Sequence, residues 1–341
     1  ERPVKVLQFG EGNFLRAFVD YMIDIANEQG KFNGDIVLVK PIEFGSLDRF
    51  HDQECQYTVQ LRGIVDGEPK RINRIVTSVA DAVDAYGEYQ KYADYAKLDS
   101  LRYIVSNTTE AGIVYDDTDR LEMEPPKSYP GKLTKFLYER YKHFNGAMDK
   151  GLVMLPVELI DDNGIHLKEC VEKLAVLWNL EEGFKTWLDE ACVFTSTLVD
   201  RIVTGYPRDE AEELCKEFGY QDNLIVTGEP FALWVIESAK DISKEFPLPD
   251  AGLPVIFTDN QKPYKQRKVR ILNGAHTSFV LASYLCGNDI VLESMQDELI
   301  FNFMKATIFD EVIPTLTLPK QDLIDFAEAV ITRFKIGRAH V

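Results

Sequence analysis

Lys268, Asn273 and His276 lie close together in the chain and are residue types that can move a proton or hold an oxygen. On a helix, Lys268 and His276 share one face and Asn273 lies at its shoulder. A lysine whose pKa is lowered by desolvation and by neighbouring cations can take a proton from an alcohol or return it to an alkoxide. Asn273 and His276 can hydrogen-bond the same oxygen. Each residue alone would more often be structural, but together they predict acid/base chemistry at an alcohol oxygen.

The surrounding segment, residues 260–288, contains no Asp or Glu. Roughly five acids would be expected there at the frequency of the whole chain. In a protein of net charge −18, a local positive patch predicts a site for a carboxylate or a phosphate. The alternative is a solvated basic loop. The cations of this basic patch are Lys262, Lys265, Arg267, Lys268 and Arg270.

A glycine-containing turn near the N-terminus is the second candidate site. It follows an expected strand over residues 4–9 and precedes an expected helix over residues 13–29. Glycines at such a turn let the backbone approach a pyrophosphate at the helix N-terminus. The third glycine of the dinucleotide fingerprint is missing, so a turn without ligand and a site for adenosyl-methionine stay open at this point. The expected cofactor contacts are Phe9, Gly10, Glu11, Gly12, Asn13 and Phe14.

Small and polar residues follow two further expected strands. Asn107 and Thr108 come at the end of a strand over residues 101–106, and Glu158 lies near the end of a strand over residues 151–160. Ligands of doubly wound sheets bind at the carboxyl ends of the strands, so these side chains predict cofactor contact or support of the site. The alternatives are an Asx or Ser/Thr turn with a helix cap, and a plain acidic turn.

The strand expected over residues 35–39 runs into Lys40 instead of the acid that binds the ribose hydroxyls in NAD sites. Lys40 could accept a ribose 2′-phosphate, which would indicate NADP, or it could be a solvated surface lysine. Glu43 and Asp48 are close enough in the chain to replace the missing acid. The residues by themselves leave NAD and NADP both open.

The order of expected elements predicts an α/β fold. Strands and helices alternate up to about residue 164, which is typical of a doubly wound parallel sheet in a Rossmann-like domain. The later part is expected to be mainly helical, including residues 231–239, 269–285 and 292–308. The predicted domains are a dinucleotide-binding domain over residues 1–222 and a helical substrate domain over residues 223–335. Residues 336–341 match a sequencing adapter in one reading frame, so a non-native tail and a missing native C-terminus are expected.

The amino-acid composition and net charge disfavour some classes of binding partner. The chain has 341 residues, of which 45% are hydrophobic and 28% charged, as in globular proteins. Its strong negative charge disfavours nucleic acid and anionic membrane surfaces. No apolar run is long enough for a membrane span, and no signal peptide precedes the first strand. Five scattered cysteines are typical of reduced thiols, so a cytoplasmic location is expected and a cysteine-based metal site is not.

Four segments together resemble the mannitol dehydrogenase family, the polyol-specific long-chain dehydrogenases. They are residues 8–17 (QFGEGNFLRA), 106–112 (SNTTEAG), 197–202 (TLVDRI) and 268–276 (KVRILNGAH). The resemblance covers nearly the whole chain up to Lys335. It implies a Rossmann-like domain followed by a helical domain, with NAD as the cofactor and no metal.

The resemblance also implies an activity, namely reduction of D-tagaturonate to D-altronate with NADH in hexuronate breakdown. Lys268 is then the general acid for reduction, Asn273 and His276 orient the reacting oxygen, and Asp200 supports the site. The basic patch with Arg270 suits the carboxylate of a sugar-acid substrate. Leu159 stands where mannitol-oxidising members have an asparagine, so either another hydrogen-bond donor replaces it or the substrate binds in a different position. Reduction of D-fructuronate to D-mannonate, another polyol or sugar-acid dehydrogenase, and a nucleotide-binding protein without turnover are the alternatives; the oligomeric state stays open.

Overall fold

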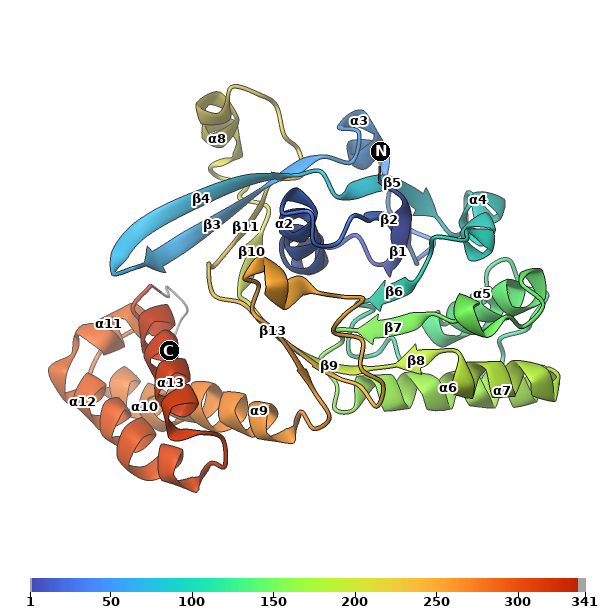
Figure 1. Cartoon of the computed structure of the whole chain (residues 1–341). Coiled ribbons are helices and arrows are strands. Elements are labelled where there is room, and N and C mark those ends of the chain that lie inside the picture. Colours follow the sequence, from blue (N-terminus) through green and yellow to red (C-terminus); the bar gives the residue numbers. More distant parts are fainter. Residues whose placement is uncertain (1, 337–341) are drawn as a thin grey trace. The chain divides into compact units, whose positions relative to one another are not determined.

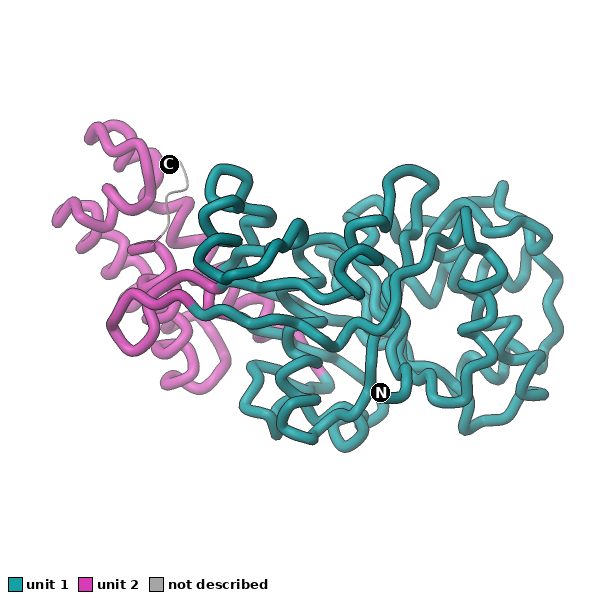
Figure 2. The backbone as a smooth tube through the Cα atoms, turned by 90° about the horizontal axis from the view of Figure 1, so that it is seen from above, with its two compact units in different colours: residues 1–60, 72–228, 232–259 teal, residues 61–71, 229–231, 260–341 magenta. Residues whose placement is uncertain are grey.

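The computed structural model describes residues 2–336, so residues 337–341 of the expected non-native tail lie outside the described residues. The chain forms two compact units, which Figure 2 shows in teal and magenta. The first unit consists of residues 1–60, 72–228 and 232–259. The second unit consists of residues 61–71, 229–231 and 260–341.

A six-stranded sheet forms the centre of the first unit, in the order β5-β2-β1-β6-β7-β8 (Figure 1). All of its neighbouring strands are parallel. The order runs outward in both directions from β1 and β6, which confirms the predicted doubly wound Rossmann-like sheet. The strands are β1 (Val4–Phe9), β2 (Asp35–Lys40), β5 (Val79–Asp84), β6 (Tyr103–Ser106), β7 (Val153–Pro156) and β8 (Val193–Phe194).

Helices connect these strands (Figure 1). The helical elements are α1 (Asn13–Leu15), η1 (Arg16–Asp20), α2 (Tyr21–Glu28), α3 (Asp48–Asp52), α4 (Tyr89–Asp94), η2 (Tyr95–Lys97), α5 (Tyr129–His143), η3 (Met148–Lys150), α6 (Asn163–Leu177), α7 (Glu182–Glu190), α8 (Ala211–Phe218) and η4 (Leu248–Ala251). The apolar faces of α4, α5, α6 and α7 are buried against the sheet in one core with Leu7, Ile104 and Met154. The helix predicted for residues 13–29 is confirmed, although a π-helical turn interrupts it.

Two smaller sheets accompany the central one, and most of their strands lie after residue 164, where the sequence predicts mainly helices. Their orders are β10-β11-β3-β4 and β13-β12-β9. The helix predicted for residues 231–239 is wrong, because this segment forms β12 (Leu233–Glu237). Five successive apolar residues of this segment, Ala232 to Ile236, are buried, and such a run has no period that separates a strand from a helix. The further strands are β3 (Tyr57–Val65), β4 (Glu68–Val76), β9 (Ser196–Asp200), β10 (Val203–Gly205), β11 (Val226–Gly228) and β13 (Val255–Thr258).

The pairing of β12 also explains where the two units divide. β12 pairs antiparallel with β9 and parallel with β13. Residues 232–259 are therefore tied to the first unit, and the chain passes to the second unit at Asn260. The sequence places the domain boundary earlier, at residues 222–223, because it does not reveal this pairing between distant segments.

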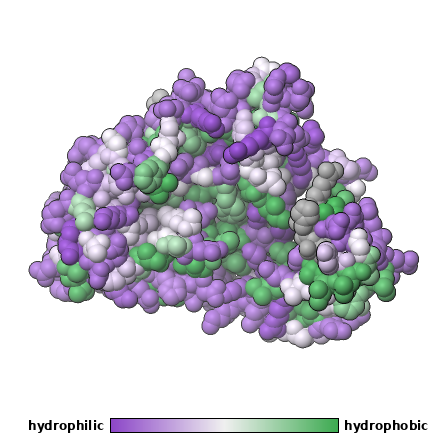
Figure 3. Space-filling view, turned by 180° about the vertical axis from the view of Figure 1, so that it is seen from behind, coloured by the Kyte–Doolittle hydropathy of each residue, from purple (hydrophilic) through white to green (hydrophobic). Residues whose placement is uncertain are grey.

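Helices make up most of the second unit. Their buried faces meet around Phe279, Met304 and Val330, and an ion pair between Arg333 and Glu229 is also buried. Exposed apolar side chains gather on this unit's surface (Figure 3), among them Leu285 and Leu299. The elements are α9 (Lys262–Arg267), η5 (Lys268–Asn273), α10 (Gly274–Leu285), α11 (Val291–Gln296), α12 (Glu298–Ala306), η6 (Thr307–Val312), η7 (Ile313–Thr315) and α13 (Lys320–Phe334). Within residues 2–336, no helix is both long and apolar enough to cross a bilayer.

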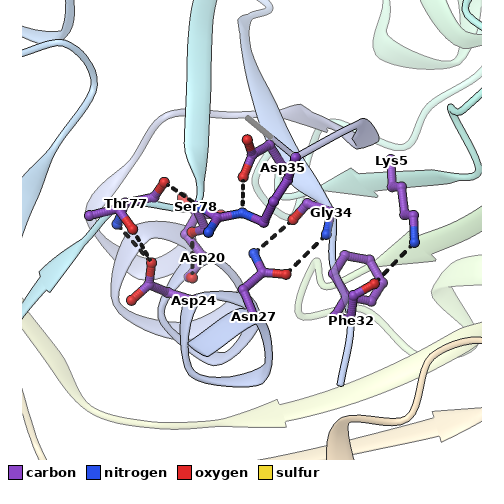
Figure 4. A network of polar contacts seen from close by, with 10 residues as sticks. Lys5, Asp20, Asp24, Asn27, Phe32, Gly34, Asp35, Thr77 and Ser78 are labelled. Atoms are coloured by element: carbon purple, nitrogen blue, oxygen red, sulfur yellow. Dashed lines mark hydrogen bonds and ion pairs between the residues drawn. The ribbon is translucent and has the colours of Figure 1, made fainter. Parts of the chain in front are cut away.

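Polar contacts fasten α2 to the ends of neighbouring strands (Figure 4). Asp24 accepts hydrogen bonds from the backbone N–H of Thr77, at 2.7 Å, and from its hydroxyl. The Ser78 hydroxyl donates to the Asp20 carbonyl, and the Asn27 side chain bonds both backbone groups of Gly34. These bonds hold the helix that follows the glycine-containing turn, and so they position the turn itself.

Arg140 on α5 joins the segments that lead into β6 and β7. Only 1% of its surface is exposed. Its guanidinium donates to four backbone carbonyls, those of Ala96, Leu98, Leu101 and Lys150, at 2.7–3.0 Å. Burial lowers the Arg140 pKa to about 10. The positive charge is thus stabilised by carbonyl dipoles, which gives these segments a common anchor.

Replacing this anchor is expected to destabilise the first unit. Arg140→Met removes the donor of four carbonyls, of which, within residues 2–336, only the Leu98 carbonyl has a second donor, the Leu101 backbone N–H. Each buried unpaired polar group costs about 1–3 kcal/mol. We expect the free energy of unfolding, measured by urea denaturation, to fall by at least about 3 kcal/mol. The control is Arg120→Met, because Arg120 also donates to backbone carbonyls but is exposed. Equal losses in the two variants would show that Arg140 is not an anchor.

Candidate active site

The glycine-containing turn joins β1 to α1 at the centre of the parallel sheet. Gly10 has φ +126°, and a Cβ atom there would lie 3.3 Å from the Asn107 carbonyl oxygen. A side chain at Gly10 would therefore be strained and crowded. At Gly12 a Cβ atom would have no neighbour within 4 Å. The turn thus brings the first glycine against β6 and leaves open space above the second, as a dinucleotide pyrophosphate requires.

A cavity of about 390 Å³ opens at this turn, above the carboxyl ends of β1, β2 and β6. This is the point where the strand order reverses, which is the usual ligand position in such sheets. Five of the predicted cofactor residues line the cavity together: Gly10, Glu11, Gly12, Asn107 and Thr108. A cavity of this size and lining could hold a large part of a dinucleotide.

The other three predicted cofactor residues make contacts within the protein. Phe9 is buried against Tyr129, with ring centroids 5.0 Å apart. Asn13 accepts a hydrogen bond from Arg16 at 2.8 Å, and Phe14 stacks on a neighbouring phenylalanine of the same helix. Arg16 also donates to the Glu11 carbonyl at 3.0 Å. These contacts within the protein stabilise the glycine-containing turn. The contribution of Arg16 to the turn is not revealed by the sequence.

Glu158 holds the loop that carries Asn107 and Thr108. One carboxylate oxygen accepts from the Thr108 backbone N–H at 3.1 Å and from its hydroxyl at 3.0 Å. The other accepts from the Ser106 hydroxyl at 3.2 Å. Glu158 is 1% exposed, and burial raises its pKa to about 7 although these hydrogen bonds oppose the shift. The segment is therefore a buried support for the cavity wall and not a plain acidic turn.

A second small cavity adjoins the loop from the other side. It has a volume of about 300 Å³ and is lined by Asn107, Thr109, Glu110 and Leu159, among others. The Leu159 side chain is exposed here and has no group that can donate a hydrogen bond. This cavity extends the candidate site along the carboxyl edge of the sheet, beyond β6 and towards β7.

The Lys40 side chain is buried, and its ammonium already has hydrogen-bond partners within the protein. It is 1% exposed. Its ammonium donates to the carbonyls of Ile42, Glu43 and Phe44 at 2.8–3.3 Å and forms an ion pair with Asp84 at 3.3 Å. The interpretation as a solvated surface lysine is therefore wrong, because a loop and a neighbouring strand enclose Lys40. The interpretation as a binding group for a 2′-phosphate stays a prediction. Glu43 and Asp48, the expected replacements for the missing acid, are exposed.

In the second unit, the predicted proton-transfer residues lie on a helix with an irregular turn. Lys268 and Asn273 are the two ends of the π-helical turn η5. In a regular α-helix they would point about 140° apart, but a π turn adds a residue and reduces this angle. Such turns occur frequently at functional sites. The sequence places Asn273 at the shoulder of the face, and the π turn brings it nearer to Lys268.

His276 follows on α10 and lies partly buried between aromatic rings. Its ring centroid is 5.6 Å from that of Phe279 and 6.3 Å from that of Phe334. This burial lowers the His276 pKa. The imidazole therefore favours its neutral form, in which one nitrogen donates a hydrogen bond and the other accepts one.

The basic patch is smaller than the sequence suggests. Arg267 is 7% exposed and lies over the Phe326 ring at 4.5 Å from its centroid, so it belongs to the core of the second unit. Arg270 is exposed and donates to Thr315 at 3.3 Å. Lys262 is exposed as well, and Lys265 is half-buried. Outside the core of the second unit, the basic patch thus comprises Lys262, Lys265 and Arg270.

Asp200 belongs to the first unit, at the end of β9. It pairs with Leu233 of β12 and is 6% exposed. The next residue, Arg201, donates to the Ala17 carbonyl at 2.6 Å and thereby ties this strand end to the helix after the glycine-containing turn. Asp200 is thus buried in the same unit as the cavity.

Comparison with known proteins places the chain in a family. Residues 4–249 match the mannitol dehydrogenase Rossmann domain, and residues 260–336 match the mannitol dehydrogenase C-terminal domain. The chain belongs to the mannitol dehydrogenase family. Its membership makes it an oxidoreductase that acts on CH–OH groups. Among residues 2–336, no group of three or more His, Cys, Asp or Glu side chains could hold a metal ion.

Curated relatives in this family are named altronate oxidoreductase. The relative from Phocaeicola vulgatus is 45% identical over 334 residues, which are 98% of this chain and 70% of that protein. The relative from Pectobacterium atrosepticum is 48% identical over 336 residues, or 98% of this chain and 69% of that protein. The relative from Yersinia enterocolitica is 46% identical with similar coverage.

Two solved dehydrogenase structures share the fold. Pseudomonas fluorescens mannitol 2-dehydrogenase, in a ternary complex with NAD and D-mannitol, has a TM-score of 0.77 at 24% identity. It covers 99% of this chain, which spans 70% of that one. A D-sorbitol dehydrogenase has a TM-score of 0.82 at 23% identity, with 97% and 70% covered. These likenesses confirm a Rossmann-like sheet followed by a helical region.

The buried carboxyl of Glu158 is expected to make stability depend on pH. Its pKa in the folded protein is raised from 4.5 to about 7. Its stabilising contribution is therefore present below about pH 4.5 and is lost as the pH rises through about 7. Glu158→Gln keeps an acceptor for Thr108 and removes the charge. We compare the free energy of unfolding of this variant with that of the parent protein at each pH. We expect the difference, variant minus parent, to be about 2 kcal/mol more positive at pH 8.5 than at pH 5.5.

Urea denaturation at the two pH values measures this difference. Asp20, whose pKa is also raised by burial to about 7, is unchanged by the substitution and cancels in the comparison. The control is Glu122→Gln, which removes an exposed carboxylate before α5. A pH dependence of Glu158→Gln equal to that of the parent would mean that Glu158 does not titrate in this range.

Proposed function

We propose that this protein reduces D-tagaturonate to D-altronate with NADH, in a reversible reaction of hexuronate breakdown. The observation that carries the proposal is the 45–48% identity to altronate oxidoreductases over 98% of the chain. The cavity at the glycine-containing turn supports binding of a dinucleotide cofactor. The backbone conformation at Gly10 favours glycine, and Gly12 leaves space for a pyrophosphate. Asn107 and Thr108, held by Glu158, line the same cavity.

When bound, NADH supplies the hydride that the substrate's carbonyl carbon accepts. The residues of this chain bind and protonate the carbonyl oxygen of the substrate, which gains negative charge in the reduction. Lys268 donates a proton to that oxygen in reduction and takes it back in oxidation. Asn273 and the neutral His276 orient the oxygen by hydrogen bonds. Asp200, a buried residue of the first unit, keeps the supporting role that the family resemblance implies for it.

A sugar-acid substrate carries a carboxylate in addition to its keto group. The second unit offers Lys262, Lys265 and Arg270 outside its core, near Lys268 in the sequence. Arg270 suits this role best, because a guanidinium can bind a carboxylate through two parallel hydrogen bonds. Mannitol has no such group, so these cations favour a uronate-derived substrate over a neutral polyol.

Oxidation of NADH, followed by absorbance, tests the proposal. D-Tagaturonate, D-fructuronate and D-fructose are offered separately to the chain and to a form extended to the length of its relatives. We expect oxidation to be fastest with D-tagaturonate. Preference for D-fructuronate would keep the reaction class but change the substrate. Tight NADH binding without oxidation by any of the three would contradict the proposed activity and favour a binding protein.

The assignment of Lys268 makes a separate prediction. Lys268→Ala removes the proton donor, and loss of a general acid lowers turnover by about 10²–10⁴-fold. The dissociation constant for NADH, measured by fluorescence titration, is expected to stay within about twofold of the parent value, because Lys268 acts on the substrate oxygen. Lys320→Ala, at an exposed position on α13, is the matched control. Near-normal turnover of Lys268→Ala would remove this residue from the mechanism.

A further inference from the structure

Asp84 lies beside the position where the acid that binds the ribose is missing. The parallel strands β2 and β5 place Lys40 in register with Asp84 at their carboxyl ends. The Asp84 carboxylate accepts a hydrogen bond from the Tyr86 backbone N–H at 2.9 Å and pairs with Lys40 at 3.3 Å. Burial alone would raise the Asp84 pKa, but hydrogen bonds from Gly87, Tyr86 and Lys40 outweigh it and keep the pKa below its ordinary value. Asp84 is therefore an ionised carboxylate at this edge.

The same edge borders the candidate cofactor cavity. Pro41 and Ile42, the residues after Lys40, line the cavity together with Glu11. Burial raises the Glu11 pKa, while Lys40 lowers it and Asp84 raises it electrostatically. The charges of Lys40 and Asp84 are thus felt at the cavity wall. In dinucleotide-binding sheets the ribose of the adenosine lies at the end of the second strand, which corresponds here to Lys40.

The ammonium of Lys40 has no hydrogen-bond donor to spare. An ammonium carries three donors, and four oxygens surround this one: three carbonyls and the Asp84 carboxylate. A 2′-phosphate could bind Lys40 only by displacing one of them. The carboxylates of Glu11 and Asp84 would also repel the phosphate.

We propose that Asp84 selects NADH over NADPH, by supplying from β5 the carboxylate that β2 lacks and by keeping the Lys40 ammonium away from a 2′-phosphate. The inference rests on the proposed function in one respect, that the cavity binds a nicotinamide dinucleotide. It differs from the sequence-based expectation, which sought the replacement acid in Glu43 or Asp48. Asp84 lies on another strand, and only the sheet register brings it to Lys40.

Two lysines that line another part of the cavity, Lys127 and Lys132, could favour binding of NADPH instead. Lys132 is 2% exposed and donates to the Tyr86 hydroxyl at 3.1 Å and to the Lys127 carbonyl at 2.6 Å. Lys127 itself is exposed at the start of α5. If Lys127 bound a 2′-phosphate, NADPH would bind tightly despite Asp84. The relative affinities of the two dinucleotides therefore separate the two cases.

Fluorescence titration of NADH and NADPH tests the proposal without any need for turnover. We expect the parent protein to bind NADH at least tenfold more tightly than NADPH. Asp84→Asn keeps an acceptor for Tyr86 but removes the charge, and it is expected to reduce this ratio at least fivefold, mainly through tighter NADPH binding. Asp84→Ser, measured in parallel, keeps a shorter acceptor. Thermal denaturation shows that each variant is folded.

The matched control is Asp81→Asn. Asp81 lies on the same strand, its side chain is 28% exposed against 26% for Asp84, and it pairs with Lys91 at 2.8 Å. We expect this variant to keep the parent ratio. An unchanged ratio in both Asp84 variants, or equal changes in Asp81→Asn, would overturn the role of Asp84 and leave the proposed function intact. Tight NADPH binding by the parent protein would also overturn it. Failure of the parent to bind either dinucleotide would contradict the proposed function itself.

Discussion

The close approach of Gly10 to the Asn107 carbonyl is the constraint on which the candidate cofactor site depends. The backbone leaves β1 with a positive φ that only glycine adopts readily. A Cβ atom at Gly10 would lie 3.3 Å from the Asn107 carbonyl oxygen and would crowd it. Hydrogen bonds from Gly10 to the Val39 carbonyl and from Asn107 to the Phe9 carbonyl join the turn to β2 and β6. The cavity opens between these strand ends because the turn is held at this place.

Buried charged groups hold segments at both edges of the central sheet, and backbone groups stabilise them. Lys40 binds three carbonyls, Arg140 binds four, and Glu158 accepts a backbone N–H and two hydroxyls. A buried charge that is held by loop backbone fixes the loop, because every bond would be lost if the loop moved. Lys40 and Glu158 therefore give the cavity walls a defined shape, whereas Arg140 anchors the opposite, amino edge of the sheet. Burial shifts the pKa values of Glu158 and Arg140 in the direction that favours their neutral forms.

In the second unit, the main feature is the π-helical turn that carries two of the predicted proton-transfer residues. Lys268, Asn273 and His276 sit on one continuous helical segment whose π turn changes which side chains share a face. A neutral His276 follows from its burial between two phenylalanine rings. Proton transfer and oxygen binding can thus be combined on a single rigid element, while the dinucleotide-binding features belong to the first unit. Family membership joins both sets of features in one type of oxidoreductase.

The sequence by itself determined the local features: β1, the glycine-containing turn, the following helix and the chemical types of the Lys268 segment, since each depends on neighbouring residues. It misassigned β12 as a helix, because a fully buried apolar run has no diagnostic period. It also missed the burial of Lys40, the support by Glu158 and the π turn at Lys268. Only the tertiary structure decided these, because strand register, burial and helix irregularity arise from contacts between residues far apart in the chain.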